Sequence, residues 1–183
     1  MESPARRTDN LYRLLKQVLQ NHIATHEMAL SDALRGCMLV LGAACVGRCR
    51  RAADIETSVY STMDHLKVHL RARQAFPPLA LFVQRPSPPE HAPLFGKRAR
   101  VLAQALGQLA SEALATDATP MRTGWWIALQ LTADVLAMHL HQYKNTLTEI
   151  DALIDATLLP VLQRHILHGY RRRGLPPSPR FRA

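Results

Sequence analysis

Apolar residues recur along this chain at intervals of three and four positions, the period of an amphipathic α-helix, and the alternation typical of strands is almost absent. The first apolar stripe follows Thr8 and Asp9, either of which can cap a helix N-terminus. Two continuations stay open: the helix runs on to Gly36, or it breaks within residues 25–31 and restarts at Ser31. The stripe consists of Leu11, Leu15, Val18 and Leu19.

Residues 31–48 are apolar on nearly every side of the expected helix. Gly36, Gly42 and Gly47 within it leave room for close approach by neighbouring helices. Because a helix without a polar face is stable only when other helices surround it, we predict that this segment is the centre of a bundle.

A third helix is expected from Asp54, a good N-cap residue, to Phe76. It must end there because Pro77 and Pro78 follow. Residues 77–93 contain six of the twelve prolines and are predicted to form an exposed connector. The inner stripe of the third helix consists of Ile55, Val59, Met63, Leu66 and Leu70.

The second half of the chain carries three further helical patterns. Thr119 and Pro120 combine an N-cap with proline at the first helical position, and apolar residues then keep a three–four spacing over residues 126–147. A last helix is expected to open at Thr148 and to kink at Pro160. The pattern that precedes these two consists of Leu102, Leu106, Leu109 and Ala113.

These elements predict an all-α, single-domain bundle of five to seven helices. The bundle occupies residues 1–174, with three helices or so on each side of the connector, and residues 175–183 form an extended basic, proline-rich tail. A chain of 183 residues with 48% hydrophobic and 20% charged residues is long enough to bury a core without disulfides.

Positive charge gathers at one end of the chain. The formal net charge is +9, and the last twenty residues from Arg164 hold six arginines and no acidic residue. A second group, which includes Lys97, opens a helix, where positive charge is unfavourable and therefore suggests a function. Guanidinium groups keep their charge and suit phosphate oxygens.

The leading hypothesis is a non-enzymatic accessory protein, a subunit of a larger assembly, that binds DNA or RNA through backbone phosphates without a cofactor. The residues expected to bind nucleic acid are Arg171, Arg172, Arg173, Arg180, Arg182, Lys97, Arg98 and Arg100.

Two other hypotheses stay open. In the first, the protein is a helical adaptor or assembly factor for an acidic protein partner, with Trp125 as an apolar anchor at the rim and Trp126 in the core. In the second, weaker hypothesis, histidine pairs on apolar stripes hold a metal or haem. The candidate ligands are His22, His26, His165 and His168.

This sequence contains no motif that indicates an enzyme. It has neither a Gly-x-Ser-x-Gly elbow nor a glycine-rich phosphate loop. Cys37, Cys45 and Cys49 lie in the apolar helix and are predicted to be reduced, buried and inert. The most apolar stretch, residues 38–47, is too short to cross a bilayer, which needs roughly 18–20 residues, so we expect a soluble, cytoplasmic protein.

Overall fold

The computed structural model describes residues 3–51, 53–75, 96–115, 120–143, 155 and 159–174. Within these ranges the chain forms six helices and no strand, which confirms the all-α bundle. The connector 77–93 and the tail 175–183 lie outside the described residues. The helices are α1 (Pro4–Thr25), α2 (Leu30–Arg48), α3 (Asp54–Ala75), α4 (Lys97–Ala113), α5 (Pro120–Tyr143) and α7 (Leu159–Arg172).

The first helix begins earlier than its apolar stripe. Neither Thr8 nor Asp9 is the N-cap, because Ser3 takes that role: its hydroxyl accepts a hydrogen bond from the Arg6 amide, and Pro4 occupies the first turn. α1 ends at Thr25, and Glu27 just beyond it has a positive φ of 48°. The break within residues 25–31 is therefore the correct alternative.

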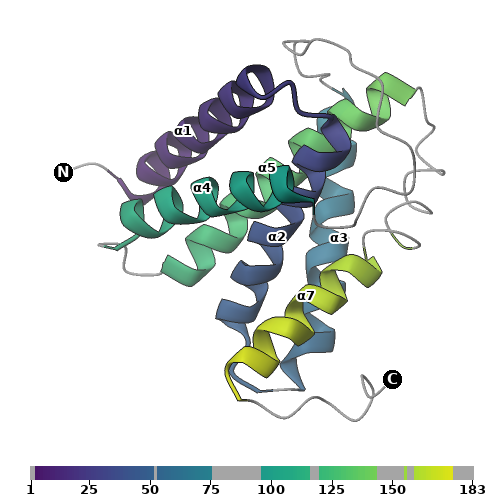
Figure 1. Ribbon diagram of the computed structural model, residues 1–183. Helices are drawn as coiled ribbons and strands as arrows, with labels where there is room; N and C mark the ends of the chain where they lie inside the picture. Colours follow the sequence, from purple (N-terminus) through teal and green to yellow (C-terminus); the bar gives the residue numbers. More distant parts are fainter. Residues whose placement is uncertain are drawn as a thin grey trace.

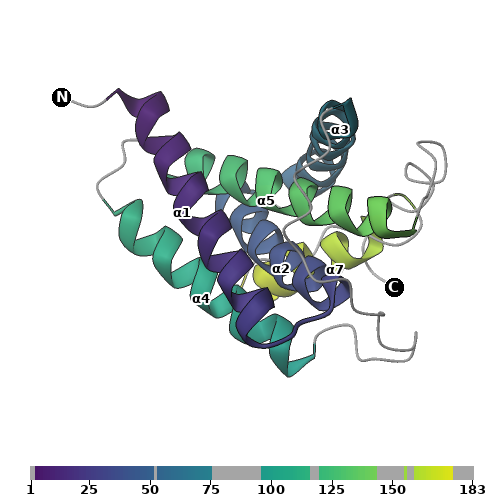
Figure 2. The same ribbon diagram turned by 90° about the horizontal axis from the view of Figure 1, so that it is seen from above.

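α2 is the central helix, as the sequence predicted. It packs against α5, α4, α7 and α3, so helices from both sides of the connector share one hydrophobic core (Figures 1 and 2). By length and mean hydropathy (1.4) α2 also qualifies as a candidate membrane span, but half of that window is buried inside the bundle. Its buried residues are Ala33, Leu34, Gly36, Cys37, Met38, Leu41, Gly42, Cys45 and Val46.

α5 is the second central helix and is buried on most of its circumference. The predicted three–four spacing includes Leu129, Ala133 and Leu136, and all three are buried. Ile127, Leu131 and other residues between them are buried as well. The three–four spacing alone underestimates how much of α5 is buried, because α5 lies between α2 on one side and α3 and α1 on others.

α7 is described from Leu159, and residues 156–158 just before it lie outside the described residues. The kink expected at Pro160 therefore stays a prediction. α7 lies across α2 at close range. A Cβ added to Gly42 would stand 2.6 Å from His165 Cβ, and one added to Gly169 would stand 2.6 Å from Val46 Cγ2. Glycine at both positions is what lets the two backbones approach.

Candidate functional site: a cationic groove

A groove of about 1,100 Å³ lies where α7 crosses the C-terminal half of α2, beside the start of α4. The described residues that line it include five arginines and two histidines, and no carboxylate is among them. Its lining consists of Leu39, Ala43, Val46, Arg100, Arg164, His165, Leu167, His168, Gly169, Arg171, Arg172 and Arg173.

α7 supplies a row of basic side chains along the groove. Arg164, His168 and Arg172 follow one another at intervals of four residues, and such residues stack on one helix face about 6 Å apart. The opposite face of α7 is buried and consists of Val161, Leu162, Ile166 and Tyr170. The amphipathic pattern therefore fixes which side chains turn toward the groove, because only one face satisfies the core.

α2 supplies an apolar floor through Leu39 and Ala43, which lie four residues apart, while Val46 beside them is buried against Gly169 of α7. Arg100 reaches the same space from α4. The start of α4 is held against α2 at Gly36, where an added Cβ would meet Leu102 Cδ2 at 2.8 Å. This contact places the turn that carries Arg100 beside α2.

The C-terminal end of α7 is anchored by two hydrogen bonds to backbone oxygens. Arg173 Nη1 donates to the Val46 carbonyl at 3.2 Å, and the Tyr170 hydroxyl donates to the Arg51 carbonyl. Arg173 therefore serves partly as a clamp on the end of α2, where carbonyl groups favour positive charge.

The remaining groove arginines keep their charge uncompensated by carboxylates in the described part of the chain. The ion pairs there join Arg13 to Asp9, Lys16 to Asp134, Arg35 to Asp32 and Lys67 to Asp155, and none includes a groove residue. Arg100, Arg164, Arg171 and Arg172 are all exposed. Grouped like charges repel one another, and an anion in the groove would relieve that repulsion.

Two histidines complete the lining. His168 is exposed, whereas His165 is half-buried against α2. Burial, together with the neighbouring His168, lowers the pKa of His165 to about 4. At neutral pH His165 therefore adds an uncharged imidazole to the groove, and the fixed charge comes from the arginines.

The structure brings together four of the eight residues predicted to bind nucleic acid: Arg100, Arg171, Arg172 and Arg173. Lys97 and Arg98 are exposed in the first turn of α4 but do not line the groove. Arg180 and Arg182 lie outside the described residues. Sequence reasoning missed Arg164 as a site residue, and its four-residue spacing to His168 was the available signal.

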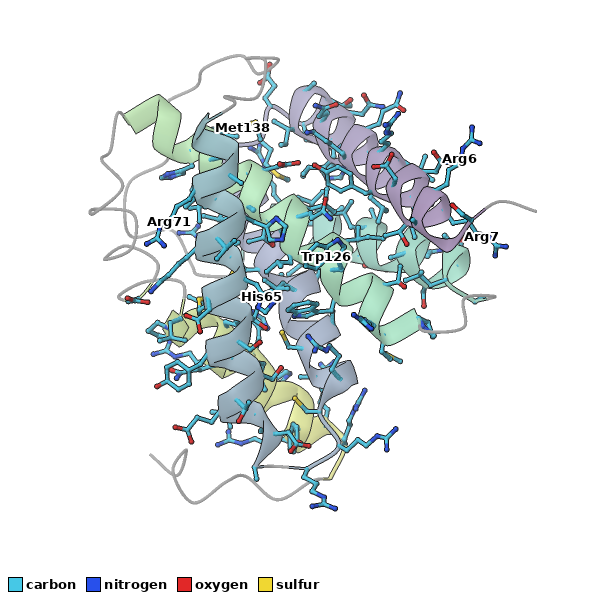
Figure 3. The ribbon with its side chains drawn as sticks, turned by 180° about the vertical axis from the view of Figure 1, so that it is seen from behind. Arg6, Arg7, His65, Arg71, Trp126 and Met138 are labelled. Atoms are coloured by element: carbon cyan, nitrogen blue, oxygen red, sulfur yellow. The ribbon has the colours of Figure 1, made fainter. Side chains whose placement is uncertain are left out.

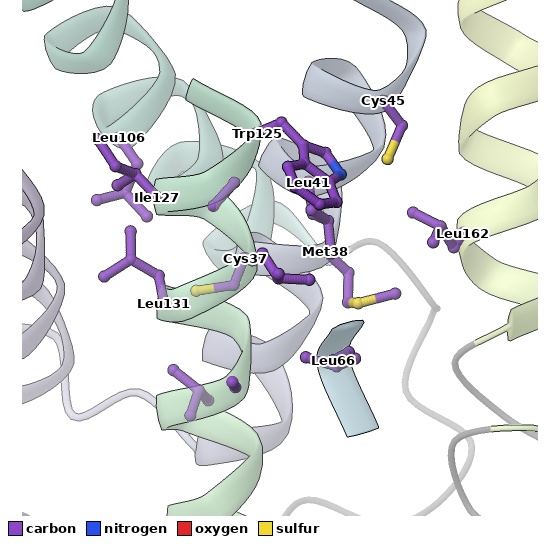
Figure 4. Packing of buried hydrophobic residues seen from close by; sticks show 14 of the residues in the cluster. Cys37, Met38, Leu41, Cys45, Leu66, Leu106, Trp125, Ile127, Leu131 and Leu162 are labelled. Atoms are coloured by element: carbon purple, nitrogen blue, oxygen red, sulfur yellow. The ribbon is translucent and has the colours of Figure 1, made fainter. Parts of the chain in front are cut away.

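The prediction for the two tryptophans was wrong. Trp125 is buried, with 5% of its surface exposed, and Trp126 is only partly buried. Figure 4 shows Trp125 among the core side chains of α2 and α5. Its indole N–H donates to Thr62 Oγ1 at 3.1 Å, and the Arg48 guanidinium lies 4.0 Å from the ring centroid. These contacts explain why Trp125 turns inward and is not available as an anchor at the rim.

The histidine pairs do not form a metal cluster in the described part of the chain, where no group of three or more His, Cys, Asp or Glu side chains converges. His22 and His26, the C-cap residue of α1, pack with their ring centroids 4.3 Å apart. His165 and His168 lie on α7, at the opposite end of the bundle from α1 (Figure 1). The four candidate ligands therefore do not meet.

The three cysteines are free and buried, as predicted. Burial, with a smaller contribution from Asp134, raises the pKa of Cys37 to about 12. Burial also raises the pKa of Cys45 and Cys49, so none of them has the lowered pKa of a reactive thiol.

Chemically, the groove offers fixed positive charge around an apolar floor, which suits an anion that also carries flat or apolar groups. Comparisons of this chain with protein-family models, with curated proteins and with solved structures found no match.

Proposed function

We propose that this protein is a non-enzymatic nucleic-acid-binding protein, which acts as an accessory subunit and holds the sugar–phosphate backbone in the groove between α2, α7 and α4. The observation that carries the proposal is the convergence of Arg100 with Arg164, Arg171 and Arg172 around one hollow whose described lining has no carboxylate. These side chains come from helices on different parts of the chain, so helix-end charge compensation does not account for their meeting.

Guanidinium groups bind phosphate oxygens through two parallel N–H···O bonds and keep their charge at any physiological pH. Binding of this kind releases counterions and weakens as salt rises. If four groove arginines each neutralise one phosphate of a single strand, log K falls with log salt at a slope of about −3. This dependence separates backbone contacts from apolar association.

The test is a double variant, Arg171→Gln with Arg172→Gln, titrated against a fluorescently labelled oligonucleotide by anisotropy. We expect binding about 10- to 100-fold weaker and a salt slope less steep by about 1.4. The matched control is Arg6→Gln with Arg7→Gln, which removes the same charge at the exposed start of α1, where both side chains point away from the bundle (Figure 3).

Unchanged affinity in the groove variant, or an equal loss in the control, contradicts the proposal. A second outcome distinguishes the adaptor hypothesis: if an acidic polypeptide of equal charge binds as tightly as the oligonucleotide at the same salt, the partner is a protein surface. Thermal melting of each variant confirms that the bundle is folded.

A further inference from the structure

The cationic groove differs in shape from the surfaces that read duplex DNA. A protein reads a duplex by inserting a helix or ribbon into a major groove about 12 Å wide, so the protein element must protrude. Here the arginines line a hollow of about 1,100 Å³ between crossing helices. Hollows of roughly 300–1,000 Å³ hold drug-sized molecules, so this one has the scale of a short run of nucleotides.

The apolar floor of the groove also distinguishes a single strand from a duplex. Leu39 and Ala43 of α2 and Leu167 of α7 contribute apolar surface to the lining. A duplex keeps its base faces stacked inside and offers no apolar surface to such a floor. A single strand exposes the faces of its bases, which proteins cover with apolar and planar side chains, including the guanidinium plane of arginine.

The row of basic side chains suits a backbone that runs along α7. Arg164, His168 and Arg172 lie about 6 Å apart in succession, as residues four positions apart on a helix do. Arg100 joins the groove from α4, away from this row. A strand that follows α7 with its phosphates would therefore bring its bases over the floor of α2.

We infer that the groove binds single-stranded nucleic acid in preference to duplex, with phosphates along Arg164, His168 and Arg172 and bases against Leu39 and Ala43. This inference rests on the proposed function and adds the class of nucleic acid. It assigns a role to the apolar floor, which backbone binding alone does not require.

The first experiment compares a labelled 12-nucleotide single strand with the duplex of the same sequence, using the full chain. We expect the single strand to bind at least about tenfold more tightly. Equal or tighter binding of the duplex overturns this inference but leaves the proposed function standing. Binding of neither oligonucleotide, or tighter binding to vesicles of anionic phospholipid, overturns both.

The second experiment tests the floor with Ala43→Glu, which places a carboxylate in the groove. Ala43 is an exposed helical residue, so the substitution is compatible with the fold. The control is Ala72→Glu, at an exposed position of α3 that does not line the groove, with the same change of charge. We expect Ala43→Glu to weaken single-strand binding at least about tenfold and Ala72→Glu to change it less than about twofold.

Equal effects of Ala43→Glu and Ala72→Glu contradict the role of the floor, because they would reflect net charge alone.

An independent variant, Arg164→Gln, is expected to weaken single-strand binding about fivefold and to make the salt slope less steep by about 0.7, the value for one phosphate of a single strand. An unchanged slope would remove Arg164 from the row.

Discussion

At the scale of single residues, the most demanding feature is a buried carboxylate that the sequence patterns did not single out. Asp134 on α5 is 4% exposed; it accepts a hydrogen bond from the Tyr12 hydroxyl and pairs with Lys16 Nζ at 3.1 Å. Burial lowers the pKa of Lys16, but the charges of Asp134 and Tyr12 and the hydrogen bonds to both together outweigh it, so the pKa ends above its usual value. Both partners lie on α1, so this cluster fastens α1 to the core.

We expect Asp134→Asn to lower the free energy of unfolding by about 1–3 kcal/mol, because Lys16 and Tyr12 would lose a buried charged partner. The control is Asp9→Asn, which breaks the pair of Asp9 with Arg13, two side chains more than half exposed. Such a pair contributes about 0–1 kcal/mol. Urea unfolding of both variants measures the difference, and equal losses would show that Asp134 is not a buried anchor.

His165 gives the bundle a predictable response to acid. Its pKa falls from 6.5 to about 4 in the folded protein because of burial and the neighbouring His168. Between these values the unfolded chain binds a proton that the folded protein does not, so stability falls as pH falls from about 6.5 to about 4. Above pH 6.5 both states are neutral and this contribution to stability is constant.

Urea unfolding at pH 7.5 and pH 5 measures this response. Burial also lowers the pKa of His139 and His22, so His165→Gln is expected to reduce the pH dependence without abolishing it. An identical pH dependence in His165→Gln and the natural protein would mean that this imidazole titrates as freely in the fold as in water.

At the scale of helices, glycine decides how α7 meets α2. The Gly42 position is closed to any side chain, because an added Cβ would stand 2.6 Å from His165 Cβ, an atom fixed to the backbone. Gly107 in α4 is the opposite case, with no heavy atom within 4 Å of an added Cβ. The two positions therefore form a matched pair within helix interiors.

We expect Gly42→Ala to lower the free energy of unfolding by about 1–3 kcal/mol and to weaken oligonucleotide binding, because α7 must shift away from α2. Gly107→Ala is expected to raise it by about 0.5–1 kcal/mol, the helix-propensity gain of alanine over glycine. Thermal melting and anisotropy measure both. A stabilising Gly42→Ala would show that α2 and α7 do not approach as closely as the structure has them.

At the scale of the whole molecule, the groove links binding to folding. It is built from α2, α4 and α7 and exists only when they are packed together. A ligand that binds the folded state alone at about 100 times its Kd stabilises by about 2.7 kcal/mol. For a chain of this size that is a rise in Tm of about 5–10 °C.

Thermal melting with and without the single-stranded oligonucleotide tests this link. The rise should vanish in the Arg171→Gln, Arg172→Gln variant, which keeps the bundle but loses groove charge. An equal rise in that variant would place the ligand on another surface of the protein.

Much of the architecture could be predicted from the sequence, because a helix that buries one face must repeat apolar residues every three or four positions. The stripe from Ile55 to Leu70 is buried along its length, and the all-round apolar segment is the central helix. Capping residues predicted the start of a helix less well where two candidates lie close together in the sequence. α1 starts at Ser3 and Pro4, and Thr8 lies inside the helix. The prediction assigned the buried position to Trp126 and the rim to Trp125, and the structure has them the other way round. Contacts of Trp125 with Thr62 and Arg48, which are distant in sequence, decide which indole turns inward.

The sequence by itself determined the helices, the central place of α2 and the excess of arginine near the end of the chain, since these depend on local periodicity and composition. Only the tertiary structure decided which arginines share a groove. Arg100 joins Arg164 because of close contacts at Gly36, Gly42 and Gly169, and Lys97 and Arg98 stay outside it. Contacts between residues distant along the chain leave no period in the sequence, so the site became visible only when the helices were packed.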